Sequence, residues 1–129
     1  MVRHLAKRFL ILIVLAFAAV NAALADEAAL RAALAKFNEG EGYAGIEAGV
    51  DALGATGDPA AAGALNALSE GLLFKRKSDG AIFINDASGT KLIDPVTGAD
   101  AGTMTSADVE KLKIKNSIRR KIGAALSGM

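Results

Sequence analysis

Apolar residues recur at helical spacing in the first part of the chain. Leu30, Leu34 and Phe37 are spaced i, i+4 and i+7, which predicts an amphipathic helix. Glycine-rich residues 38–42 interrupt this pattern. Two further stripes of the same kind follow, and they consist of Tyr43, Ile46, Val50 and Leu53, and of Leu65, Leu68 and Leu72. We therefore expect residues 26–70 to be helical.

The turn between the second and third stripes has its own helix signals. Gly57 fits a helix end, Asp58 fits an N-cap, and Pro59 fits a first helical turn. A helix, this turn and another helix rich in Ala and Leu resemble a HEAT-like pair. One such pair cannot bury its own apolar face, so either the following β region or further repeats must cover it.

The pattern changes to short alternating segments in residues 71–104. Leu72 with Phe74, and Ile82 with Ile84, predict two strands joined at the hairpin dipeptide Asp-Gly. ASGT then predicts a second turn, KLI a third strand, and DPVTG a further turn. Together these segments predict a small antiparallel β-meander, so the expected fold class is α+β.

Residues 105–129 are expected to return to helix. The sequence TSAD fits a capping box, which predicts a short helix from near Ser106. The following KLKIK fits either a strand or the tail of that helix. Asn116 is the expected N-cap of a final helix, whose apolar stripe is Ile118, Ile122 and Leu126.

The N-terminus has the three-part pattern of a secretory signal peptide. A basic start precedes an uninterrupted apolar run at 9–20, which is shorter than the roughly 20 residues of a membrane span. Ala23 and Ala25 then form an A-x-A site before Asp26. We predict that residues 1–25 are a signal peptide, that it is cleaved after Ala25, and that residues 26–129 are periplasmic. An uncleaved signal anchor is the alternative.

Composition excludes several kinds of chemistry. The chain has no cysteine, and its one histidine, His4, lies in the predicted signal peptide. Nucleophilic Ser-His and Cys-His sites and zinc sites built on Cys or His are therefore excluded for the exported part. Turn carboxylates are the remaining candidates for paired-acid chemistry or a calcium site, namely Asp79, Asp86, Asp94 and Asp100, with Asn85 and Ser88 beside them. The EF-hand order and every phosphate-binding glycine motif are missing, so we expect no catalytic residue, cofactor or metal.

Charge is unevenly distributed. Residues 26–70 hold eight acidic and two basic residues, whereas residues 71–129 hold ten basic and six acidic ones. Six cations concentrate in one stretch, which we call the basic stretch: Lys111, Lys113, Lys115, Arg119, Arg120 and Lys121. Nucleic-acid binding is disfavoured because no aromatic residue is interleaved for stacking. A membrane-surface helix, a solvated helix face, and pairing with the acidic first half remain as alternatives.

Several motifs together resemble one protein family. They are LGATGDPAAAGALNAL, GLLFKRKSDGAIFI, LIDPVTG and DVEKLKIKNSIRRKI, in that order after the signal pattern. They are similar to the N-terminal exported segment of urea ABC transporter permeases, which are permeases of the branched-chain amino acid type. The resemblance covers essentially all 129 residues.

The resemblance implies a periplasmic segment that precedes a multi-span domain in the inner membrane. The implied partners are a soluble urea-binding protein, a second permease and ATPase subunits. The family continues into further helical repeats and membrane spans where this sequence stops at Met129. We therefore expect a fragment, a truncated reading frame or an excised domain without the transport pathway. Its expected role is non-catalytic docking or structure, with the basic stretch as docking face and no nucleic-acid partner; a free-standing exported binding or adaptor protein is the alternative.

Overall fold

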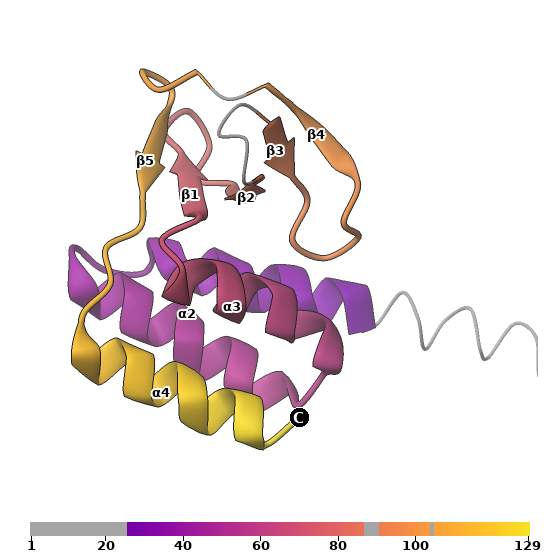
Figure 1. The fold of residues 1–129 in the computed structure, drawn as a ribbon, viewed down its shortest axis with the longest axis vertical. Helices are drawn as coiled ribbons and strands as arrows, with labels where there is room; N and C mark the ends of the chain where they lie inside the picture. The colour runs from indigo at the N-terminus through magenta and orange to yellow at the C-terminus, as the bar shows by residue number, and fades with distance from the viewer. Residues whose placement is uncertain (1–25, 87–90, 104) are drawn as a thin grey trace, which may run out of the picture.

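The computed structural model describes residues 26–86, 91–103 and 105–129, which form an α+β fold. A five-stranded antiparallel sheet lies on one side of the helices (Figure 1). The predicted cleavage site at Ala23 and Ala25 and the predicted turn at 87–90 lie outside the described residues.

The helices of the first half follow the predicted stripes. Residues 26–35 are helical and continue into the 3-10 turn η1 (Lys36–Asn38), while α2 spans Tyr43–Thr56. The predicted stripe of the first helix is buried throughout. Tyr43 is the exception in the second stripe: its side chain is 38% exposed because it begins the helix at the edge of the core.

The turn after α2 has the predicted chemistry. Gly57 adopts a left-handed φ of 61°, and the carboxylate of Asp58 accepts a hydrogen bond of 2.9 Å from the N–H of Ala60. The short turn η2 (Pro59–Ala61) then leads into α3 (Ala62–Ser69). Leu72 does not belong to this helix, as the stripe had suggested, because Gly71 at a φ of 75° ends the helical path.

The sheet has the strand order β4-β3-β2-β1-β5. Its strands are β1 (Leu73–Arg76), β2 (Ile82–Asn85), β3 (Lys91–Ile93), β4 (Asp100–Thr103) and β5 (Val109–Lys111). The predicted hairpin between β1 and β2 and the predicted turn after β3 are confirmed, with Gly80 and Gly98 at positive φ. Strand β4, which this turn joins to β3, was not predicted.

The alternation predicted for the first strand is wrong. Leu73 rather than its neighbours Leu72 and Phe74 is fully buried, and it lies opposite Ile84 in the register. Because three consecutive residues are apolar, the sequence does not show which of them faces the core. In the structure, pairing with Ile84 places Leu73 on the face of the sheet that contacts the helices.

The short helix expected near Ser106 is also wrong, and residues 105–129 are not helical throughout. The segment forms a turn closed by the N–H of Asp108 and the carbonyl of Thr105, at 2.9 Å, and then continues as β5. Strand β5 pairs with β1 and buries Val109. Pairing along a sheet edge together with this burial outweighs a local capping signal.

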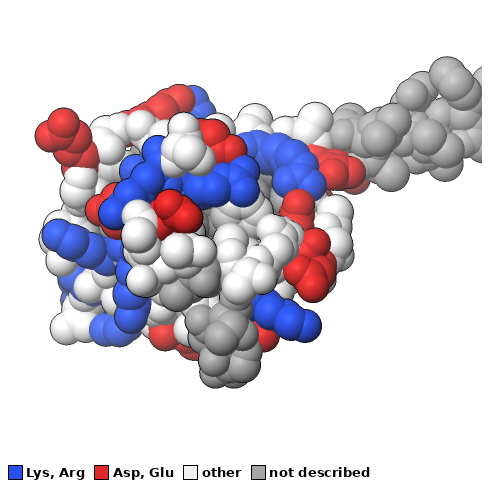
Figure 2. Space-filling model, turned by 90° about the horizontal axis from the view of Figure 1, so that it is seen from above, with Lys and Arg blue, Asp and Glu red and all other residues white. Residues whose placement is uncertain are grey.

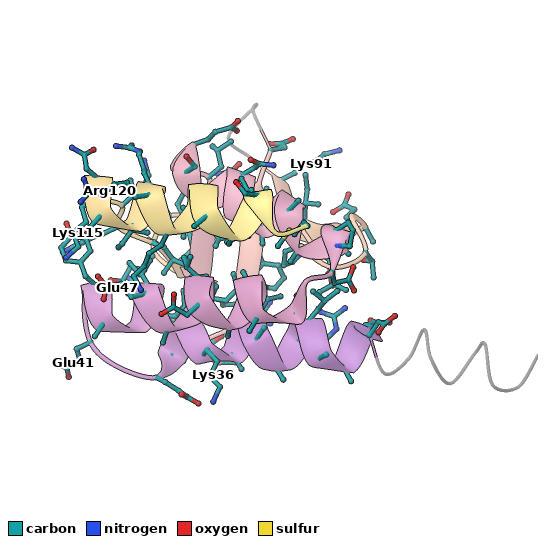
Figure 3. All side chains as sticks on the ribbon, turned by 90° about the horizontal axis from the view of Figure 1, so that it is seen from below. Lys36, Glu41, Glu47, Lys91, Lys115 and Arg120 are labelled. Atoms are coloured by element: carbon teal, nitrogen blue, oxygen red, sulfur yellow. The ribbon has the colours of Figure 1, made fainter. Side chains whose placement is uncertain are left out.

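Helix α4 spans Asn116–Ser127 and completes the core. Asn116 is its first helical residue and not its cap, because no side chain caps this helix and Lys115 precedes it with extended backbone. Ile118 and Ile122 are buried against the other helices as predicted. The helix packs along α2 and touches α3 (Figure 3), so the apolar face of the helical pair is covered by both α4 and the sheet.

Candidate functional site

The basic stretch runs from the end of β5 to the first turns of α4. Lys111 ends β5, residues 112–115 have no regular secondary structure, and Arg119 lies in the first turn of α4. The end of β5 and the start of α4 lie on the left of Figure 1, and Figure 2 shows Lys and Arg side chains on the left of the molecule seen from above. The stretch lies on the surface, where Lys111 and Lys113 line a cavity of about 310 Å³ together with the loop before α2, and Lys121 lines a second one of about 310 Å³ beside α2.

Alternation of apolar and basic residues explains this orientation. Leu112 is buried in the core between helices and sheet, and so is Ile118 one turn into α4. Burying these two residues turns the charged positions between and after them toward solvent, and all six cations of the stretch are exposed. The alternative of a solvated helix face is confirmed for α4, because one face of this helix is packed in the core and the other is exposed.

Two of the six cations face acidic residues on α2. The ammonium of Lys121 lies 3.1 Å from the carboxylate of Asp51, and that of Lys115 lies 3.8 Å from the carboxylate of Glu47. The ammonium nitrogen of Lys115 also lies over the ring of Tyr43, 4.3 Å from the ring centroid. The expected pairing between the acidic first half and the basic second half is therefore present. We call Lys115 and Lys121 the inner cations.

Three other members of the stretch have no acidic partner among the described residues. No carboxylate of the described chain lies within 4.0 Å of Lys113, Arg119 or Arg120, and Arg119 makes one long contact of 3.5 Å to the amide oxygen of Asn116. Arg120 points away from α2 in Figure 3. We call Lys113, Arg119 and Arg120 the outer cations.

Lys111 belongs to neither group. The end of its side chain lies against Gly71, so that a β-carbon placed there would stand 3.0 Å from its Cε atom. Lys111 therefore extends along the end of α3 and not toward α2.

The acidic partners on α2 were not singled out from the sequence, although a signal was present. Glu47 and Asp51 are spaced i, i+4 and so occupy one face of a predicted helix. Lys115 directly precedes another helix, and Lys121 lies about one and a half turns into it. Sequence alone did not show that these two helices lie side by side.

The candidate acids Asp79 and Asp94 line one cavity of about 340 Å³ between the first helix and the β1–β2 turn. Each carboxylate is already engaged: Arg76 donates two hydrogen bonds to Asp79, at 2.9 and 2.6 Å, and Arg31 donates one of 3.0 Å to Asp94. The cavity is therefore edged by internal ion pairs.

The pKa values of both carboxyls are lowered. The hydrogen bonds from Arg76, helped by the N–H of Ala81, lower the pKa of Asp79 to about 2. Burial alone would raise the pKa of Asp94, but the backbone N–H groups that follow it and Arg31 outweigh burial and lower it. A paired-acid hydrolase needs one carboxylic acid with a raised pKa, so this pair lacks the required asymmetry.

The other two turn acids do not approach this cavity. Asp100 accepts a hydrogen bond from the N–H of Gly102, and Asp86 accepts one from the N–H of Lys91. Ser88, the remaining candidate calcium ligand, lies outside the described residues. In the described ranges, no three side chains of His, Cys, Asp or Glu gather as a metal site would require.

No family model, curated protein or solved structure matches this chain. Within residues 26–86, 91–103 and 105–129, none of the helices has the length and apolar character needed to cross a bilayer.

Proposed function

We propose that the chain is a non-catalytic, periplasmic docking module of a urea-type ABC transporter permease. The proposal rests on the sequence resemblance and on the predicted signal peptide of residues 1–25. The module would act at the periplasmic face of the inner membrane, beside the permease and ATPase subunits, and would contact the soluble urea-binding protein. It would support urea uptake without forming the pathway.

One structural observation supports docking in particular. The carboxylates that line the cavity are held by arginines of the same chain, whereas the outer cations are exposed and without an acidic partner in the described residues. Exposed charges cost little to maintain and become useful when a complementary surface approaches, because such complementarity raises the rate of association and selects the partner.

The test is a binding measurement between the full chain and the cognate periplasmic urea-binding protein. We expect association at low ionic strength that weakens steeply between 0.05 and 0.5 M salt, roughly the range in which the Debye length shrinks from well above 10 Å to about 4 Å. Absence of binding at both ionic strengths would remove the docking function. Binding that is insensitive to salt would move the contact away from the basic stretch.

Export has a separate test. Expression with the native N-terminus should yield a periplasmic product whose first residue is Asp26, as determined by N-terminal sequencing or intact mass. A product that retains residues 1–25 would favour the anchored alternative.

A further inference from the structure

The six cations of the basic stretch are not equivalent, and this difference identifies the contact surface within the docking face. The inner cations are already bound to Glu47 and Asp51 on α2. A partner that used them would have to replace an existing ion pair. The outer cations offer the same charge without that competition.

The side chains of the outer group suit carboxylates. Arg119 and Arg120 present planar guanidinium groups that can donate two parallel hydrogen bonds to one carboxylate. Both lie on a helix whose position is held by the fully buried Ile118 and by Ile122, so their backbone is fixed before a partner arrives. Lys113 adds a third exposed charge in the extended segment before the helix.

A bilayer is a poor match for this surface. An interfacial helix inserts its apolar face among the lipids. In α4 that face is occupied, because Ile118 is 0% exposed and Ile122 is 2% exposed in the core. Attachment to lipid would rest on charge alone.

Nucleic acid is also a poor match. Single strands are held by aromatic rings on which bases stack. Among the described residues, Tyr43 is the one large apolar side chain that is exposed, and Lys115 covers its ring. This end of the molecule therefore offers charge without a stacking platform.

We propose that the outer cations Lys113, Arg119 and Arg120 dock an acidic protein surface, while the inner cations Lys115 and Lys121 stay paired with Glu47 and Asp51 on α2. This inference rests on the proposed function for the identity of the partner, the urea-binding protein. It does not rest on it for the chemistry, which is a cluster of carboxylates.

The experiment compares two double variants of the full chain that lose the same charge. Arg119→Gln with Arg120→Gln removes two outer charges, and Lys115→Gln with Lys121→Gln removes two inner charges. Binding is measured to the urea-binding protein and, separately, to poly-L-glutamate as a probe of carboxylate recognition. Thermal unfolding of each variant is measured in parallel.

We expect the outer variant to bind both probes at least about tenfold more weakly, since each lost contact to a charged group is worth roughly a factor of ten. Its thermal midpoint should stay unchanged. The inner variant should keep its affinity, and its thermal midpoint should fall only slightly, because both of its ion pairs are solvent-exposed. Equal loss in both variants would indicate unspecific attraction and would overturn the inference, as would undiminished binding of the outer variant.

The two proposals fail in different ways. The parent chain could bind poly-L-glutamate through the outer cations and not bind the urea-binding protein. That result would support the outer cations as a carboxylate-binding surface and would refute the proposed function. If the outer variant binds the urea-binding protein as tightly as the parent chain does, the outer cations are refuted as the contact surface and the proposed docking function is supported. Binding to vesicles that contain phosphatidylglycerol, or to a single-stranded oligonucleotide, in place of poly-L-glutamate would overturn the choice of an acidic protein.

Discussion

Helix α2 packs against neighbours on two sides, and the two contacts use different physical means. On one side lies η1, where the ring of Phe37 rests directly on Gly49, and a β-carbon at that glycine would overlap the ring. On the other side lies α4, which contributes large aliphatic residues and whose rim carries the ion pairs of the inner cations. The first contact depends on the absence of a side chain at Gly49, whereas the second combines aliphatic residues of α4 in the core, a close approach of Ala125 to Gly54 and charge at its edge.

This difference predicts which changes each contact tolerates. A close contact that leaves no space for a methyl group fails when atoms are added. A contact built from interlocking aliphatic side chains fails when atoms are removed. Charges at a solvated rim contribute little in either direction.

The largest effect should come from removing bulk on the α4 side. Ile118 is fully buried, so Ile118→Ala should lower the free energy of unfolding by about 2–5 kcal/mol, as measured by urea denaturation. Leu126→Ala, on the same stripe but only partly buried, should cost less. If both substitutions lowered the free energy of unfolding equally, Ile118 would not be the main contact of α4 with the core.

The next effect should come from adding one methyl group on the opposite side. Gly49→Ala introduces atoms where the Phe37 ring lies, and overpacking of this kind costs about 1–3 kcal/mol. Better helix propensity returns at most about 1 kcal/mol, so we expect net destabilisation in the same denaturation assay.

Gly123→Ala is the matched control, because it also lies within a helix and nothing stands within 4 Å of its added β-carbon. It should stabilise the protein by about 0.5–1 kcal/mol. If both alanines stabilised the protein, the close contact between η1 and α2 would be refuted.

The two sides of α2 were not equally predictable from sequence. Periodicity located the apolar stripe of α4, and charge asymmetry suggested pairing with the acidic first half, since both are properties of residue type and spacing. Gly49 has no comparable signal in the sequence, because a glycine within a helix indicates only lower helix stability. The close approach of Phe37 in η1 explains why a glycine is needed there.

The failed expectations have a related cause. Periodicity shows which face of a helix is apolar but not which element covers it, so the stripe of α4 did not reveal that α2 lies beside it. TSAD is a valid local helix signal, yet Val109 gains more from burial beside β1. The basic stretch was located from charge alone, but its division into inner and outer cations required the positions of Glu47 and Asp51.

A third contact of the helical part, this time with the sheet, should respond to acid. The pKa of Asp94 is lower in the folded protein than in an unfolded chain, so its contribution to stability is present above the unfolded pKa, about 3.9, and disappears as the pH falls through the folded value. Asp94→Asn should therefore show a smaller decrease in thermal midpoint than the parent below about pH 4.

The asparagine oxygen can still accept the backbone N–H groups of Val96 and Thr97, which keeps the turn intact in this variant. Arg31→Gln should reduce the same acid sensitivity from the helix side, because it removes the guanidinium that binds Asp94. Parallel pH profiles for parent and both variants would show that this ion pair does not link the first helix to the sheet.

The smallest expected effect lies at the charged rim between α2 and α4. Lys121 and Asp51 are 3.1 Å apart, but their side chains are 42% and 61% exposed. A double-mutant cycle with Lys121→Gln and Asp51→Asn should give a coupling of about 0.2–1 kcal/mol at low salt. The coupling should shrink at 1 M salt, where the Debye length is about 3 Å. A coupling that exceeds the cost of Gly49→Ala and persists in salt would reverse the comparison, because charge and not close packing would then be the stronger attachment of α2.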